Sequence, residues 1–123
     1  MTVRKLAAIA ALAALPACSF QNKYEKEAQA ITAAIVANNM QPVQGDIAPG
    51  IKITRVQVAA MSDELGEAGK LISLKETTTN CPPGTHCFDV KFEKRAYVEH
   101  MTLDENGKVR DWNYVPAPAA SAN

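Results

Sequence analysis

The chain has 123 residues, which is enough for one small domain with a single hydrophobic core. Its 13 lysines and arginines are balanced by 13 aspartates and glutamates, and the sequence has no basic stripe of the kind that binds nucleic acid. No internal repeat is visible, so a single domain is expected.

The start of the chain has the three features of a secretory signal peptide. Arg4 and Lys5 form a short basic start, an apolar run follows from Leu6 to Leu15, and the small residue Ala17 stands where a signal peptidase would cut. The run is too short to cross a bilayer, which takes about 20 apolar residues. Residues 1–17 are therefore predicted to be a leader that is removed on export.

The sequence Leu15-Pro16-Ala17-Cys18 resembles the lipobox of bacterial lipoproteins. The resemblance implies that Cys18 is acylated, becomes the first residue of the mature chain and carries several acyl groups, such as palmitate, that anchor the protein in membrane lipid. Pro16 departs from the family pattern, which usually has Ala, Ser or Thr there. Ordinary cleavage after Ala17 is the alternative, although Leu15 is larger than the residue that such a cut prefers.

The cysteine count also favours lipidation. The chain has three cysteines, and an odd cysteine in a secreted protein requires an explanation. Cys81 and Cys87 are close enough in sequence to pair, which leaves Cys18 for acylation or, in the alternative, as a free thiol. By resemblance to lipoproteins, Ser19 in place of Asp favours the outer membrane of a bacterial envelope over the inner one, with the domain facing the periplasm.

The mature chain is predicted to begin with its one helix, from Gln21 to about Met40. Apolar residues recur at steps of three and four, Ser19 is the expected N-cap, and Asn38-Asn39 followed by Pro42 ends the helix. The apolar stripe is expected to face the core, with headgroup contact as the alternative for its first two members. The stripe consists of Phe20, Tyr24, Ala28, Ile31 and Ile35.

The following stretch reads as a loop, a strand and a turn. Gln41–Gly50 contains two prolines and two glycines and is predicted to be a connection. The alternation from Ile51 to Ala60 predicts a strand with a bulge near Thr54-Arg55. Ser62–Gly69 is predicted to be a polar turn.

A strand over Leu71–Thr79 is expected to point Ile72 and Leu74 inward. Between Cys81 and Cys87, Pro83-Gly84 suits the centre of a type II turn, so the two cysteines would face each other across a hairpin mouth. In an oxidising compartment they are predicted to form a disulfide, which stabilises a loop this short by about 2 kcal/mol at most.

Three further strands are predicted: Phe88–Phe92, Ala96–Leu103 after a bend, and Val109–Val115 after the hairpin turn Asp104–Gly107. The expected fold is α+β, with one N-terminal helix packed on an antiparallel sheet of four to five strands. The domain would span residues 18–115, followed by a flexible Pro/Ala-rich tail over 116–123. The strand and hairpin pattern is similar to small periplasmic PepSY-like domains and to cystatin-like or NTF2-like folds, a likeness that implies no functional residue.

Few residues point to metal or catalytic chemistry. Cys81, His86 and Cys87 are three metal-ligand types in a short segment, but their spacing is not a zinc pattern, and a disulfide would consume both thiolates. Five intervening residues also differ from the C-x-x-C of redox sites. Glu99 and His100 are adjacent on a strand and so point to opposite faces. The sequence therefore predicts no catalytic residue, no metal ligand and no cofactor.

Trp112 and Tyr114 share one face of the final strand and are the candidate partner-binding residues, because aromatic side chains are enriched at interface hot spots. Packing beneath the helix is the alternative. The expected function is a membrane-anchored, non-enzymatic module that binds an unknown envelope protein or peptide through its sheet or a sheet edge. The alternative is a carrier of a small apolar ligand held between the helix and a curled sheet. An enzyme would need a cleft where Glu99, His100 or an Asp converge.

Overall fold

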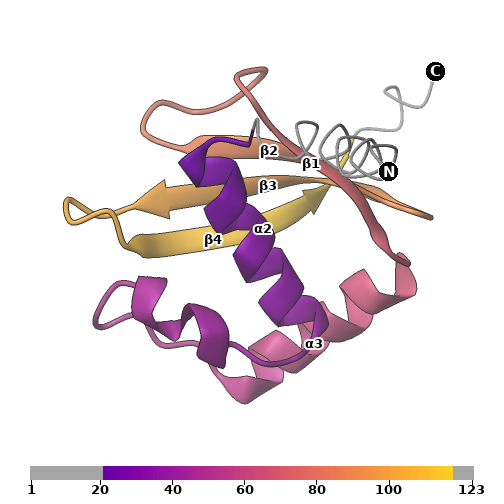
Figure 1. The fold of residues 1–123 in the computed structure, drawn as a ribbon, viewed down its shortest axis with the longest axis horizontal. Helices are drawn as coiled ribbons and strands as arrows, with labels where there is room; N and C mark the ends of the chain where they lie inside the picture. Colours follow the sequence, from indigo (N-terminus) through magenta and orange to yellow (C-terminus); the bar gives the residue numbers. More distant parts are fainter. Residues whose placement is uncertain (1–20, 118–123) are drawn as a thin grey trace, which may run out of the picture.

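The structure is a computed structural model, and it describes residues 21–117. Within them the chain forms an antiparallel four-stranded sheet with helices packed against it, which confirms the predicted α+β class (Figure 1). The elements in chain order are the helix α2 (Lys23–Val36), the 3₁₀ helix η3 (Gln41–Asp46), the helix α3 (Arg55–Glu67) and the strands β1 (Leu71–Thr77), β2 (His86–Phe92), β3 (Ala96–Leu103) and β4 (Val109–Pro116).

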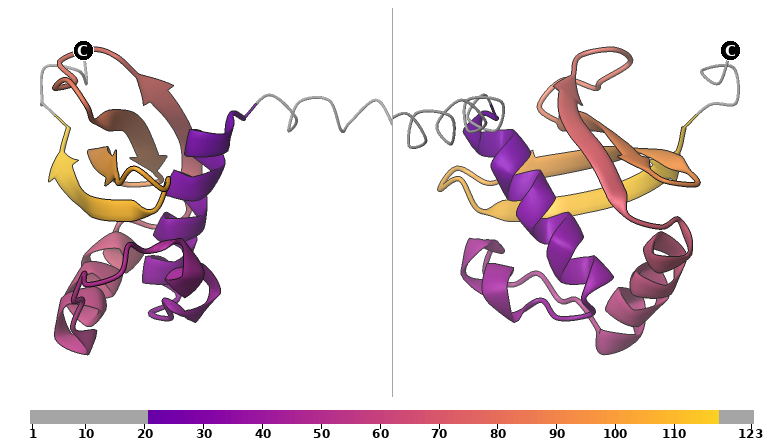
Figure 2. Two further views of the ribbon diagram at one scale, coloured as in Figure 1. Left: turned by 90° about the vertical axis from the view of Figure 1, so that its left-hand side faces the viewer. Right: turned by 45° about the vertical axis from the view of Figure 1, so that its right-hand side comes forward.

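The sheet is a meander in the order β1-β2-β3-β4, so each strand pairs with its neighbour in sequence. Figure 2 shows that the sheet is curled and that α2 crosses one of its faces. The helix α3 and the 3₁₀ helix η3 lie at the end of the domain where α2 ends (Figure 1). This leaves β1 and β4 as the two edge strands.

The core lies between α2 and the sheet. The alternating residues Phe88, Val90 and Phe92 of β2 are at most 3% exposed, as the period of two predicts. Ile31 and Ile35 of α2 are fully buried against them, which confirms the helix stripe. The remaining buried apolar residues of this cluster include Ala28, Ala34, Val43, Leu65, Leu74, Tyr97, Met101 and Val109.

Ile72 does not face inward as predicted and is 59% exposed. The pairing of β1 with β2 shifts between Leu71 and Ser73, and this irregularity breaks the alternation of faces along the strand. Leu71 therefore packs against the core and Leu74 is buried, while Ile72 between them points to solvent.

The helix α2 begins later and ends earlier than its apolar pattern indicates. Its N-cap is Asn22 and not the predicted Ser19: the Asn22 side chain accepts a hydrogen bond from the Glu25 backbone at 2.8 Å, and the Glu25 side chain accepts one from Asn22 N at 3.1 Å. Asn38 adopts a φ of 55°, and this left-handed residue ends the helix after Val36. Asparagine was correctly predicted as the terminator, but one turn too late.

Asn22→Ala is expected to lower the free energy of unfolding by about 1 kcal/mol, the usual contribution of an N-cap side chain. The substitution also removes the hydrogen bond from Asn22 Nδ2 to Glu76 Oε1, at 2.9 Å, which links the start of α2 to β1. Urea unfolding would measure the loss. Lys26→Ala, an exposed position on the same helix, is the control, and an equal loss there would rule out capping as the cause.

The predicted strand over Ile51–Ala60 and the predicted turn over Ser62–Gly69 are both wrong. Residues 55–67 form the helix α3, and its N-cap Thr54 makes a second capping box with Gln57. Val58 and Leu65 are its buried residues and lie seven positions apart, and α3 packs against α2. The preceding connection contains the 3₁₀ helix η3, with Val43 buried.

The hairpin predictions hold. Cys81 and Cys87 form a disulfide with their Cα atoms 5.8 Å apart. Thr85 N donates to Pro82 O at 3.2 Å, and Gly84 has a φ of 76°, as a type II turn requires. Lys94 lies in the predicted bend between β2 and β3, and Gly107, with a φ of 80°, closes the β3–β4 hairpin.

The predicted tail starts too early, because Pro116 belongs to β4 and Ala117 N donates to Ala96 O at 3.0 Å. The rest of the tail, Phe20, and the lipobox with Cys18 all lie outside the described residues. Among residues 21–117, no helix is both long and apolar enough to cross a membrane.

Candidate functional site

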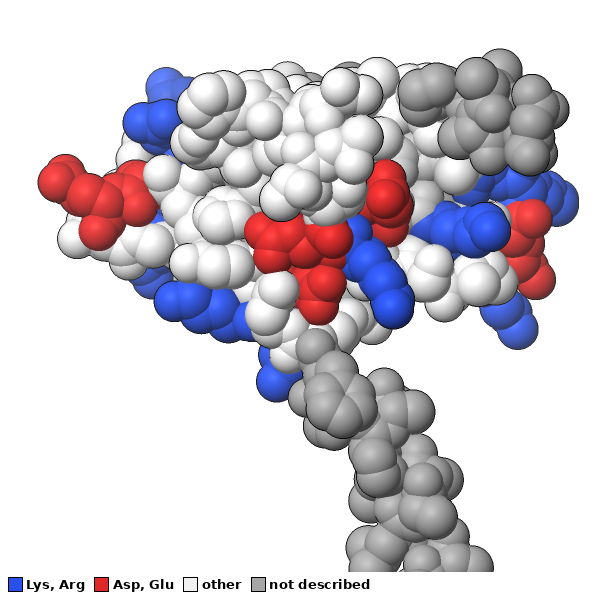
Figure 3. All heavy atoms as spheres, turned by 90° about the horizontal axis from the view of Figure 1, so that it is seen from above, with Lys and Arg blue, Asp and Glu red and all other residues white. Residues whose placement is uncertain are grey.

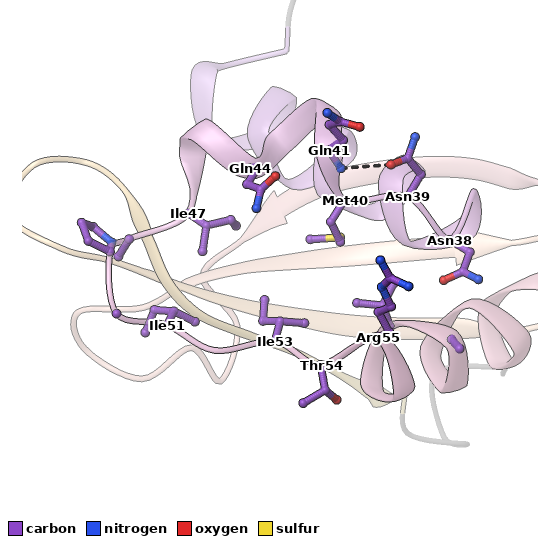
Figure 4. A pocket seen from close by; sticks show the side chains of 15 residues that line it. Asn38, Asn39, Met40, Gln41, Gln44, Ile47, Ile51, Ile53, Thr54 and Arg55 are labelled. Carbon is purple, nitrogen blue, oxygen red and sulfur yellow. Dashed lines mark hydrogen bonds between the residues drawn. The ribbon is translucent and has the colours of Figure 1, made fainter.

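A groove of about 990 Å³ opens between η3, the segment that follows it and the start of α3 (Figure 4). It lies at the end of the domain where α2 stops, and Asn38 and Asn39, just beyond that end, form part of its wall. The other lining residues are Met40, Gln41, Gln44, Ile47, Ala48, Pro49, Gly50, Ile51, Ile53, Thr54, Arg55, Val58 and Ala59.

Apolar side chains from the two walls face each other across this groove. In Figure 4, Met40 and Ile47 point toward Ile51 and Ile53, which approach from the opposite side. Ile51 is 36% exposed and is one of the five exposed large apolar residues of the described chain. Apolar surface left open in this way is typical of a binding site.

Polar side chains surround the apolar floor of the groove, which is formed by Met40, Ile47, Ile51 and Ile53. The side chains of Asn38, Asn39, Gln41 and Gln44 supply amides that can both donate and accept hydrogen bonds. Asn39 Oδ1 already accepts from Gln41 N at 3.1 Å, the bond drawn in Figure 4. A neutral rim of this kind matches the hydrogen-bonding groups of a peptide backbone.

Arg55 is the only charged residue in the lining. It makes no ion pair with any residue in the range 21–117, and it occupies the first position of α3, where the helix dipole adds positive potential. In Figure 4 its guanidinium group extends into the groove. By contrast, acidic and basic side chains are interspersed on the face shown in Figure 3, which gives no field of one sign there.

The wall formed by η3 is attached to the rest of the domain at its C-terminal end. Ile47 forms a parallel bridge with Val109 of β4, and Ala48 N donates to Val109 O at 2.8 Å. Lys108 Nζ donates to Gly45 O at 2.6 Å. Glu27 of α2 lies next to Asp46 of η3, and burial together with this neighbouring carboxyl raises the pKa of Glu27 to about 7. These contacts fix one wall of the groove to α2 and to the β3–β4 hairpin.

Trp112 and Tyr114, the predicted partner-binding residues, lie half-buried on the face of β4 that packs against the core. The Tyr114 hydroxyl is 2.7 Å from Thr32 Oγ1 of α2, and the Tyr114 ring contacts Tyr97 edge to face. Trp112 Nε1 is buried without a hydrogen-bond partner among the described residues. Their role in partner binding stays a prediction.

Glu99 is a buried carboxyl group whose burial the sequence did not predict. It is 0% exposed on the inner face of β3, where Thr32 Oγ1 donates to its Oε1 at 3.3 Å and its Oε2 has no partner among residues 21–117. Burial raises the pKa of Glu99 to about 8, and burial also raises the pKa of Tyr114 beside it. The carboxyl is therefore held protonated at neutral pH. His100 is half-buried on the other face, so the two residues do not form an acid–base pair.

A second, smaller pocket of about 170 Å³ lies between α3 and β4. Its lining includes Trp112 and Tyr114 together with Met61, Glu64 and Leu65. The space between α2 and the sheet, where a carrier would hold its ligand, contains the fully buried side chains of Ile31 and Phe88. A carrier function would therefore have to use the groove or this smaller pocket.

The region around the disulfide carries a separate polar contact. The ring of His86 stacks on Tyr24 with centroids 4.0 Å apart, and His86 Nδ1 lies 3.0 Å from Glu76 Oε2. Tyr24 therefore packs within the domain, as its place in the helix stripe predicts. In the described range 21–117, no three His, Cys, Asp or Glu side chains are placed to hold a metal ion.

No family model matches the sequence, and no curated protein or solved structure matches it either. The fold and the groove therefore define this protein only as an α+β domain with an open groove at one end, whose lining contains one charged residue.

Proposed function

We propose that this protein is a lipid-anchored, non-enzymatic module of the bacterial envelope that binds a protein or peptide partner. The anchor would be the acylated Cys18, and the outer membrane is favoured because Ser19, and not Asp, follows it. The observation that carries the binding function is the groove lined by Met40, Ile47, Ile51 and Ile53, whose apolar floor is open to solvent.

The position of the groove supports a partner outside the membrane. Cys18 lies just before the described residues, so an acylated Cys18 would hold the start of α2 near the lipid surface. The 14 residues of α2 measure about 21 Å along the helix axis, and the groove lies beyond the far end of that helix. It would then open toward the periplasm, where a protein could reach it.

The anchor is tested by separating envelope fractions and by mass spectrometry of the mature N-terminus. The wild-type protein is expected entirely in the membrane fraction with an acylated Cys18, and the Cys18→Ala protein in the soluble periplasmic fraction. A wild-type protein that is freely soluble with an unmodified thiol would contradict the proposal.

Binding at the groove is tested by photo-crosslinking in living cells. A photoreactive amino acid at Gln44, on the exposed rim, is expected to give discrete crosslinked products. The same amino acid at Asp89, an exposed position on the outer face of β2, is the matched control and should give none. Equal labelling at both positions, or none at Gln44, would exclude the groove as the partner site.

A further inference from the structure

The backbone beside the groove has unused hydrogen-bonding groups. Residues 51–53 belong to no helix or strand, and within residues 21–117 the N–H groups of Lys52 and Ile53 have no hydrogen-bond partner. The flanking groups are engaged: Ile51 N donates to Ala48 O at 3.3 Å, and Thr54 N donates to the Gln57 side chain at 3.0 Å. Successive N–H groups of a strand point in opposite directions, so one of these two groups can pair with an added strand, as in peptide recognition by β-augmentation.

The side chains of this segment form a row on one side. Ile51, Ile53 and Arg55 are two residues apart, and Figure 4 shows all three directed into the groove. In a pair of strands, residues opposite each other on one face are in contact, and opposite charges there are favourable. A strand added along this segment would thus place two side chains against the isoleucines and a third against Arg55.

We infer that the groove binds a protein partner through an extended peptide segment that pairs with residues 51–53, inserts two alternate apolar side chains between the walls, and presents an acidic side chain to Arg55. This inference rests on the proposed binding function and adds the chemistry of the partner. We expect the partner to supply an acidic side chain because of charge complementarity: Arg55 is the only charged residue of the lining and has no ion pair among residues 21–117. A single arginine is too little for a nucleic acid, which needs several cations along its backbone.

The test uses the mature acylated protein in detergent micelles and a phage-displayed library of short random peptides, each flanked by constant sequences on both sides. Enriched peptides are expected to share two apolar residues and an Asp or Glu at alternate positions. Their affinity is then measured by fluorescence anisotropy. Arg55→Gln is expected to weaken binding at least about tenfold, the effect of a charge-assisted hydrogen bond of about 1.4 kcal/mol. Arg110→Gln, an exposed arginine on β4 outside the groove, should leave the affinity unchanged.

Two further measurements separate this mode of binding from others. N-methylation of the peptide amides that pair with residues 51–53 should abolish binding. The Arg55→Glu protein should bind a peptide in which Lys replaces the acidic residue. Enriched peptides that bind Arg55→Gln as well as wild type would overturn the inference and leave the proposed function standing. Failure to enrich any peptide would count against both, and binding of anionic vesicles through Arg55 would replace the peptide with a lipid.

Discussion

Glu99→Gln is expected to make the protein more stable at pH 8 by about 2–4 kcal/mol while changing its stability little at pH 4.5. The glutamine keeps the shape of the side chain and its contact with Thr32, which lies 3.3 Å from Glu99 Oε1. It cannot ionise, so it never places a charge in the core. The difference between the two proteins should therefore grow with pH.

The sign follows from where the proton is held. Burial raises the pKa of Glu99 to about 8 in the folded protein, whereas the unfolded chain has the ordinary value near 4.5. Between these values the unfolded state releases the proton and the folded state keeps it. The wild-type protein consequently loses up to about 1.4 kcal/mol of stability for each pH unit from about 4.5 to about 8.

Urea unfolding followed by the fluorescence of Trp112, from pH 4.5 to pH 9, measures this slope. A residual slope should persist in Glu99→Gln, because burial and Asp46 also raise the pKa of Glu27, to about 7. Glu105→Gln, an exposed position in the hairpin turn, is the control and should follow the wild type. If Glu99→Gln also ran parallel to the wild type at every pH, Glu99 would not be buried as a neutral acid.

The strands could be predicted from the sequence because each has a local signal. Phe88, Val90 and Phe92 alternate with charged residues, and the β1–β2 and β3–β4 turns contain Gly84 and Gly107 with positive φ. The helix α3 was missed because Ile51, Ile53, Val56 and Val58 also mimic alternation over a short run, and such runs do not distinguish strand from helix. The signal that could have identified it is the capping-box pattern Thr54-x-x-Gln57.

The site depends on contacts that no local pattern encodes. Glu99 meets Thr32 across 67 positions of sequence, so its burial follows from the packing of α2 on the sheet and not from its neighbours in the chain. The groove likewise needs α3 to be a helix and Ile47 to be attached to Val109. The alternation pattern that predicts a strand and a turn over residues 55–67 also places Ile51 and Ile53 within a sheet, so it does not predict their position on a groove wall.

Gly69→Ala and Gly66→Ala form a matched pair of substitutions at the end of α3, and we expect opposite effects on stability. Gly69 has a φ of 92°, and a Cβ there would lie 2.6 Å from Glu93 Oε1 and 2.9 Å from Glu93 Cβ. Gly66 lies inside α3, and a Cβ there meets nothing within 4 Å. Gly69→Ala should therefore cost about 2–3 kcal/mol, and Gly66→Ala should gain up to about 1 kcal/mol.

The cost at Gly69 is not confined to one dihedral angle, because Glu93 joins two elements there. Lys70 N donates to Glu93 Oε1 at 2.8 Å, Glu93 N donates to Lys70 O at 3.0 Å, and an added methyl group would push the Glu93 side chain out of this arrangement. The two variants should differ in melting temperature by roughly 15 °C, since 1 kcal/mol corresponds to about 4–8 °C in a domain of this size. Equal melting temperatures would mean that the junction between α3 and β1 tolerates a side chain at residue 69, and that Glu93 does not fix the position of α3 against the sheet.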